Sequence, residues 1–130
     1  MKIDRRKFIA GIPITLWFAD NIFSLTVSGK EKMFGLIGKM IAAEGKRDEL
    51  IEILLEGTNE MPGCLSYIVA KDSKDSNAIW ITEVWKDEKS HKDSLSLPVV
   101  QKAIAKGRPM IAGFGDQTII EPVGGQGLKM

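Results

Sequence analysis

A proline-glycine break in the middle of the chain is the feature that most constrains its fold. The segment Met61-Pro62-Gly63-Cys64 follows a helical pattern, and proline ends a helix because it lacks a backbone donor and clashes with the preceding turn. Residues 79–87, Ile-Trp-Ile-Thr-Glu-Val-Trp-Lys-Asp, then form a β-type run with one carboxylate among aromatic side chains. Together these cues predict the order strand, helix, strand, strand, helix, strand, which is that of a ferredoxin-like α+β unit.

The spacing of apolar residues sets the expected bounds of these elements. Apolar residues recur at helical spacing from Lys46 toward the Pro62 break, whereas the hairpin strands read as alternating runs. Asp87 is the expected N-cap of the next helix, and Pro98 can open a further helical piece. The expected strands cover residues 33–43, 65–71, 78–85 and 117–123, and the expected helices begin at 46, run from 88 to 94 and run from 99 to 106.

Residues 1–29 have the layout of a bacterial secretory signal. Arg5 and Arg6 precede an apolar run at residues 9–19, which is shorter than the ~20 residues that span a bilayer. The paired arginines resemble the twin-arginine signal that exports folded proteins. An uncleaved anchor or an interfacial helix is the alternative. We therefore expect a periplasmic or otherwise exported protein that meets a membrane only during export, with its domain at residues 30–125 and a flexible tail at 126–130.

The composition excludes several classes of function. A formal net charge of +1 offers no basic surface for nucleic acid. One histidine and one cysteine cannot supply a zinc or copper site of the usual ligand count, so no metal is expected. The glycine-rich segment at 124–127 precedes no helix and does not match a phosphate-binding loop. Cys64 cannot form a disulfide within its own chain and is expected to act as a small buried apolar residue.

The uncovered side of the predicted sheet indicates a partner. Two helices cover one face of a four-stranded sheet, while the strand at 78–85 carries bulky side chains on both of its faces. An exposed apolar face of that size marks an interaction surface. The simplest partner is a second copy related by a two-fold axis, so we expect a homodimer.

The order and spacing of three motifs resemble the antibiotic biosynthesis monooxygenase family, including its quinol monooxygenases. These motifs are Glu44-Gly45-Lys46, Met61-Pro62-Gly63-Cys64 and Glu83-Val84-Trp85-Lys86-Asp87. The resemblance covers about residues 33–123 and implies a dimeric α+β barrel with a pocket between sheet and helices in each subunit. Several members oxidise phenols or hydroquinones with molecular oxygen and without metal or flavin, whereas others degrade haem or isomerise small molecules. The fold therefore does not fix the reaction.

His91 and Glu83 are the expected catalytic residues. An unperturbed pKa of ~6.5 lets a histidine accept a phenolic proton near neutrality. A solvated His91 on an exposed helix face is the alternative, and haem ligation is a lesser one. The resemblance places a histidine at the position of Ser94, about one helical turn later, so this chain departs from the family there. Glu83 is either a desolvated acid near Trp85 or a partner for a basic residue across the dimer.

Four residues are expected to bind the substrate. Trp85 offers a flat face for an aromatic ring, and Ile81 lies on the same face of its strand. Tyr67 can direct its hydroxyl into the same cavity or into solvent, and Arg108 can clamp an anionic group or cover the barrel mouth. The expected function is a cofactor-independent monooxygenase or oxidase that acts on a small aromatic, quinol-like molecule with molecular oxygen as co-substrate. A non-catalytic binding module for a hydrophobic metabolite, a small-molecule isomerase and a haem-binding protein are the alternatives.

Overall fold

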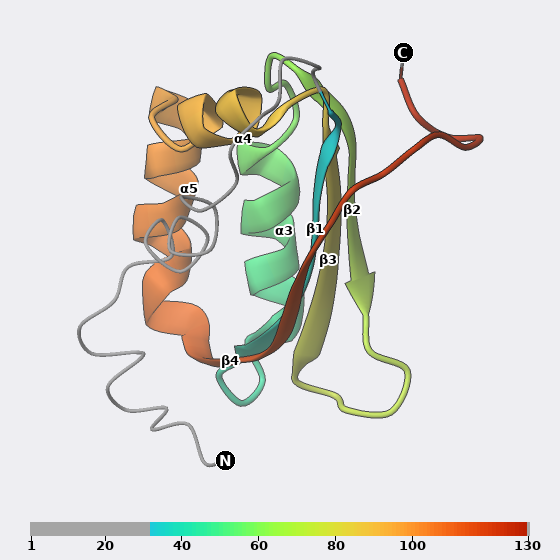
Figure 1. The fold of residues 1–130 in the computed structure, drawn as a ribbon. Helices are drawn as coiled ribbons and strands as arrows, with labels where there is room; N and C mark the ends of the chain where they lie inside the picture. Colours follow the sequence, from blue (N-terminus) through green and yellow to red (C-terminus); the bar gives the residue numbers. More distant parts are fainter. Residues whose placement is uncertain (1–31, 130) are drawn as a thin grey trace.

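Residues 32–129, which the computed structural model describes, form an antiparallel sheet whose helices cover one face (Figure 1). The strand order is β2-β3-β1-β4, so β1 and β3 lie in the centre. The elements in chain order are β1 (Phe34–Ala42), α3 (Arg47–Gly57), β2 (Cys64–Lys71), β3 (Ala78–Trp85), α4 (Glu88–Ser94), α5 (Pro98–Gly107), the 3-10 turn η1 (Arg108–Met110) and β4 (Ile111–Ile120). The predicted ferredoxin-like α+β fold is confirmed.

The predicted signal segment at residues 1–29 lies outside the described residues, so export remains a prediction. Within residues 32–129, no helix has both the length and the apolar character that a membrane crossing requires. At the other end of the chain, Pro122 lies over Gly35 of β1, and the backbone N–H of Lys129 donates to the carbonyl of Leu65 at 2.9 Å. The expected flexibility of residues 126–130 likewise remains a prediction.

The start of α4 is fixed by a helix cap and by contacts with the turn that precedes β2. Asp87 caps the helix by accepting a hydrogen bond from the backbone N–H of Ser90 at 2.7 Å. Gly63, with φ of +82°, makes the left-handed turn that leads into β2, and its carbonyl accepts from the N–H of Lys86 at 2.9 Å. A side chain at Gly63 would collide with Ser90. This turn therefore brings the start of β2 against the helix that carries His91.

The last strand differs from its expected bounds. β4 begins at Ile111 and ends at Ile120, whereas the expected strand covered 117–123. Glycines at 113 and 115 interrupt the apolar alternation and make the first half read as a loop. In the structure this half pairs with β1, with register shifts that mark irregular pairing along β1. The expectation was wrong because strand pairing, and not local propensity, forms this half of β4.

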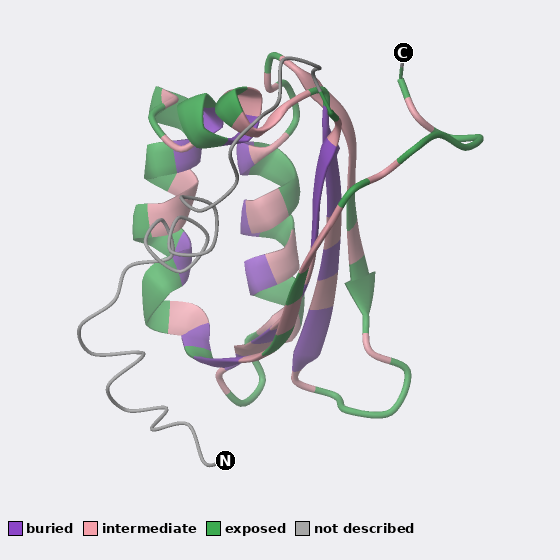
Figure 2. Ribbon diagram, in the orientation of Figure 1, coloured by how far each residue is buried: buried purple, intermediate pink, exposed green. Residues whose placement is uncertain are grey.

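The hydrophobic core lies between the sheet and the helices. Figure 2 shows buried residues along the central strands and on the sides of α3 and α5 that face each other. Helices α3 and α5 approach each other closely at Gly57, where a Cβ atom would lie 2.3 Å from the Cβ of Ala103. Side chains from β1 and β3 make up most of the core.

The opposite face of the sheet also carries bulky groups. Trp80 lies on this face, where its indole N–H donates to the Asp72 carboxylate at 2.8 Å and the Lys39 ammonium lies 5.6 Å from its ring centroid. Ile68 on β2 is 57% exposed. A single chain does not test the homodimeric barrel, which remains a prediction.

Candidate functional site

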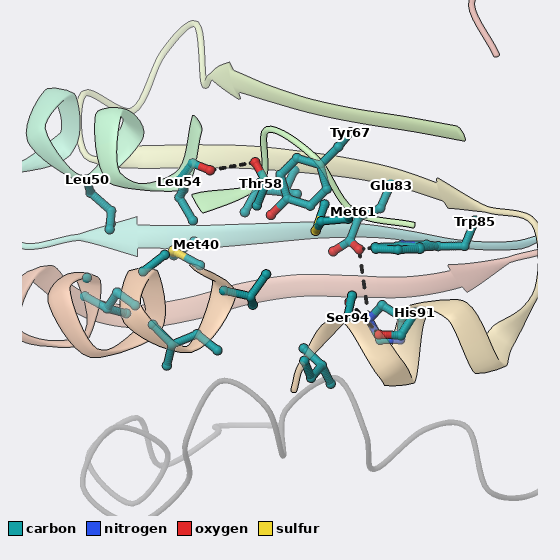
Figure 3. A pocket seen from close by; sticks show the side chains of 17 residues that line it. Met40, Leu50, Leu54, Thr58, Met61, Tyr67, Glu83, Trp85, His91 and Ser94 are labelled. Atoms are coloured by element: carbon teal, nitrogen blue, oxygen red, sulfur yellow. Dashed lines mark hydrogen bonds and ion pairs between the residues drawn. The ribbon is translucent and has the colours of Figure 1, made fainter. Parts of the chain in front are cut away.

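A cavity of about 60 Å³ lies between the sheet and the helices (Figure 3). Most of its walls are apolar, and they come from helices α3, α4 and α5 and from all four strands. Figure 3 shows Met40 and Leu50 toward one end and the polar residues Glu83, His91 and Ser94 toward the other. The cavity is therefore a mainly apolar hollow with Glu83 and His91 on one side.

Glu83 is a buried carboxyl group on β3. Its residue is 3% exposed, and one oxygen, Oε1, accepts a hydrogen bond from the indole Nε1 of Trp85 at 2.8 Å. The two side chains meet because residues two apart on a strand share a face. Burial raises the pKa of Glu83 to about 7, and the Trp85 hydrogen bond only partly opposes that rise. Near neutral pH both the protonated and the ionised form of this carboxyl group are therefore populated.

His91 is buried beside the same carboxyl group. It is 1% exposed, and its ring lies 5.1 Å from that of Phe34 and 5.6 Å, edge to face, from that of Trp85. Its Nε2 lies 3.9 Å from Glu83 Oε1. Burial lowers the pKa of His91 to about 4. At this distance burial opposes both charges, so near neutral pH His91 is uncharged, Glu83 is divided between its acid and carboxylate forms, and the two groups do not form an ion pair.

The remaining predicted site residues divide into two groups. Tyr67, Ile81 and Trp85 line the cavity, and Tyr67 lies opposite Glu83 in the β2–β3 register. Trp85 is 1% exposed, so its ring is part of the cavity wall and leaves little of its face free to stack on a ligand in this conformation. Arg108 lies in η1, is exposed and does not line the cavity. The structure thus brings five of the six predicted residues together and leaves out Arg108.

Two groups on β2 also lie near the Glu83 carboxyl. Burial raises the pKa of the Tyr67 phenol and of the Cys64 thiol, and the charge of Glu83 adds to both rises. Cys64 is half-buried, as a small apolar residue would be. Neither group supplies a cation to the site, so Glu83 is not paired with a base from β2.

Several residues of the site were not predicted from the sequence. Ser94 lines the cavity, and its hydroxyl donates to the His91 carbonyl at 2.6 Å. Met61 reaches the cavity from the loop after α3, and Val100 reaches it from α5. Helical periodicity marks Val100 as buried, but no local signal shows that it borders a hollow.

The cavity limits what can bind without rearrangement. At about 60 Å³ it is smaller than an apolar cavity of ~150 Å³ that accepts benzene. A single-ring ligand therefore requires side chains to move, and Met40 and Met61 are flexible enough to do so. A haem group does not fit this space, and the His91 imidazole that would ligate it is covered by other rings. Among residues 32–129, no three His, Cys, Asp or Glu side chains are grouped to hold a metal ion.

Comparisons with known proteins agree with this architecture. The sequence profile of the antibiotic biosynthesis monooxygenase family matches residues 33–106. A crystal structure from Chloroflexus aurantiacus, provisionally described as an antibiotic biosynthesis monooxygenase, is 62% identical, with a TM-score of 0.72 over 74% of this chain and 98% of its own. No functionally curated protein matches the chain.

More distant crystal structures share the fold alone. SnoaB from Streptomyces nogalater, described as a cofactor-independent oxygenase, is 11% identical, with a TM-score of 0.61 over 73% of this chain and 97% of its own. A Caulobacter crescentus structure, also provisionally described as an antibiotic biosynthesis monooxygenase, is 19% identical, with a TM-score of 0.60 over 71% of this chain and 89% of its own.

Proposed function

The chain belongs to the antibiotic biosynthesis monooxygenase family, and we propose that it is a cofactor-independent monooxygenase or oxidase of a small aromatic, quinol-like substrate. The observation that carries this proposal is the buried carboxyl group of Glu83 in the wall of an apolar cavity. Such a cavity favours an apolar ring, and a titratable carboxyl beside it can accept a hydroxyl proton.

The proposed reaction draws its electrons from the substrate. Loss of a proton raises the electron density of a quinol and makes electron transfer to oxygen easier. As an oxidase, the protein would convert quinol and O₂ to quinone and hydrogen peroxide, with two electrons and two protons transferred. As a monooxygenase, it would convert quinol and O₂ to a hydroxyquinone and water. Neither balance requires a further reductant.

Oxygen consumption with a panel of hydroquinones tests this function. We expect uptake by the wild-type protein and a loss of at least tenfold in Glu83→Gln, which keeps the shape and the acceptor of the side chain. His91→Ala also removes a buried ring, so its folded state must be checked by circular dichroism. Glu52→Gln is the matched control, because Glu52 is an exposed carboxyl group on α3 that does not line the cavity. Stoichiometric binding of a hydroquinone without oxygen uptake would contradict the proposal and support a binding module.

The geometry argues against the isomerase alternative. An isomerase of this kind needs an acid and a base on opposite sides of its substrate. Glu83 and His91 approach within 3.9 Å, which leaves no room for a molecule between them. An isomerase that uses Glu83 and His91 as its acid and base is therefore not supported.

We also propose that the protein works as a homodimer that packs sheet against sheet. The open face carries Trp80 and the exposed Ile68 on the side away from the helices. Family membership supports this arrangement, because a ferredoxin-like sheet covered on one side leaves an apolar face to bury. Sedimentation velocity tests it, with a two-chain mass expected and a stable single chain contradicting it.

A further inference from the structure

Building on the proposed oxidation, we propose that Glu83 is the residue that accepts the substrate proton and that Trp85 is its positioning residue. His91 is then a neutral neighbour that packs against the pair. This assignment differs from a histidine base and gives Trp85 a role other than stacking on the substrate.

The hydrogen bond from Trp85 fixes one side of the carboxyl group. Its indole N–H donates to Oε1 at 2.8 Å, and both side chains are almost fully buried. Figure 3 shows the other carboxyl oxygen turned toward the cavity. Because Trp85 holds one carboxyl oxygen of Glu83, the other oxygen is directed toward a ligand in the cavity.

His91 is less suited to accept the proton. Its ring lies against Phe34 and Trp85, and its Nε2 points to the oxygen that Trp85 already holds. A substrate hydroxyl in the cavity would meet the inward oxygen of Glu83 first. Burial also lowers the pKa of His91 and raises that of Glu83, which makes the carboxylate the stronger base of the two.

The proposed step moves one proton and no electrons. The substrate O–H bond breaks, its proton forms an O–H bond to the inward carboxyl oxygen, and the electron pair stays on the substrate oxygen. In the oxidase reaction the ionised substrate then passes two electrons and its second hydroxyl proton to O₂, which gives the quinone and hydroperoxide, and Glu83 returns the first proton to form hydrogen peroxide. The groups that face Glu83 during this step are Trp85 on β3, His91 on α4, and Tyr67 and Cys64 on β2.

The positioning role has a signature that a purely structural role would not give. The Trp85 N–H stabilises the charged carboxylate, so its removal should raise the pKa of Glu83. Infrared titration of the protonated carboxyl band, identified by its loss in Glu83→Gln, measures this directly. We expect Trp85→Phe to move the midpoint upward by about one pH unit, the size of a hydrogen bond to a charged group. Trp80→Phe, which loses an indole bonded to Asp72, should leave it unchanged.

The acceptor role is tested without turnover by 4-nitrophenol, whose ionised form absorbs visible light. We expect the wild-type protein to ionise the bound probe at neutral pH and Glu83→Gln to bind it largely un-ionised. His91→Phe removes the competing base and alters the cavity wall, so its affinity for the probe can differ from that of the wild type, but the bound probe should still be ionised. Ionisation that survives in Glu83→Gln but disappears in His91→Phe would overturn the assignment, as would a titration midpoint unaffected by Trp85→Phe. If the probe is ionised and no hydroquinone consumes oxygen, the proposed oxidation fails and the assignment stands.

Discussion

Replacing Glu83 by glutamine should stabilise the protein increasingly as the pH rises. The amide keeps the oxygen that accepts from Trp85 and cannot ionise. In the wild type, the pKa of Glu83 rises from 4.5 to about 7 on folding because the group is buried. Between these values the unfolded carboxyl is ionised and the folded one holds its proton, so the unfolded state binds fewer protons and stability falls with pH.

The magnitude follows from the same pKa. At about 1.4 kcal/mol for each pH unit, the wild type loses about 3 kcal/mol through Glu83 between pH 4.5 and 7. The variant should therefore gain about 3 kcal/mol relative to the wild type over this range. His91 acts in the opposite direction, because its pKa falls from 6.5 to about 4 on folding. The contribution of His91 to the free energy of unfolding therefore rises with pH between about 4 and 6.5. In the wild type this rise nearly offsets the fall that Glu83 causes.

Urea denaturation at several pH values from about 4.5 to 7.5 measures these differences. Subtracting the wild-type curve removes the contributions of all other titrating groups. The free energy of unfolding of Glu83→Gln, relative to that of the wild type, should then rise with pH. That of His91→Phe should fall with pH. A difference that stays constant with pH would refute a carboxyl held neutral by burial. A Glu83→Gln variant that loses stability as pH rises would show instead that Glu83 and His91 form an ion pair.

Three further changes test the packing around the site. Gly57→Ala places a methyl group 2.3 Å from the Cβ of Ala103 and should lower the free energy of unfolding, measured in urea, by about 1–3 kcal/mol. A loss no larger than that of Gly115→Ala on β4 would contradict the close contact between α3 and α5. Asp87→Ala removes the α4 cap and should cost about 1 kcal/mol in thermal denaturation, with Asp87→Asn recovering most of it; equal losses in both would exclude a capping role. Met61→Ala should enlarge the cavity and tighten binding of 4-nitrophenol several-fold, and unchanged binding would mean that Met61 does not limit entry.

Local signals predicted most of the fold. The strand at 78–85 and the helix at 88–94 match β3 and α4, because an alternating apolar run and an aspartate cap act within a few residues. The first half of β4 could not be predicted in this way. Its glycines give no strand signal, and only pairing with β1 makes the segment extended.

The site was predictable where it depends on a single strand. Glu83 and Trp85 share a face of β3, so their proximity follows from the two-residue period. The burial of His91 does not follow from sequence, because Ser90 and Lys92 beside it are polar and the surrounding rings come from β1 and β3. The lowered pKa of His91 is a consequence of that tertiary packing. For the same reason, the sequence could not decide which of the two titratable groups is the better base.

A crystal structure with 4-nitrophenol bound at neutral pH would show directly which group receives the substrate proton. We expect the ring inside the cavity, with Met61 displaced and the phenol oxygen within hydrogen-bond distance of the inward oxygen of Glu83, while Trp85 keeps its bond to Oε1. A ring bound elsewhere, or one whose oxygen contacts His91 and not Glu83, would contradict it.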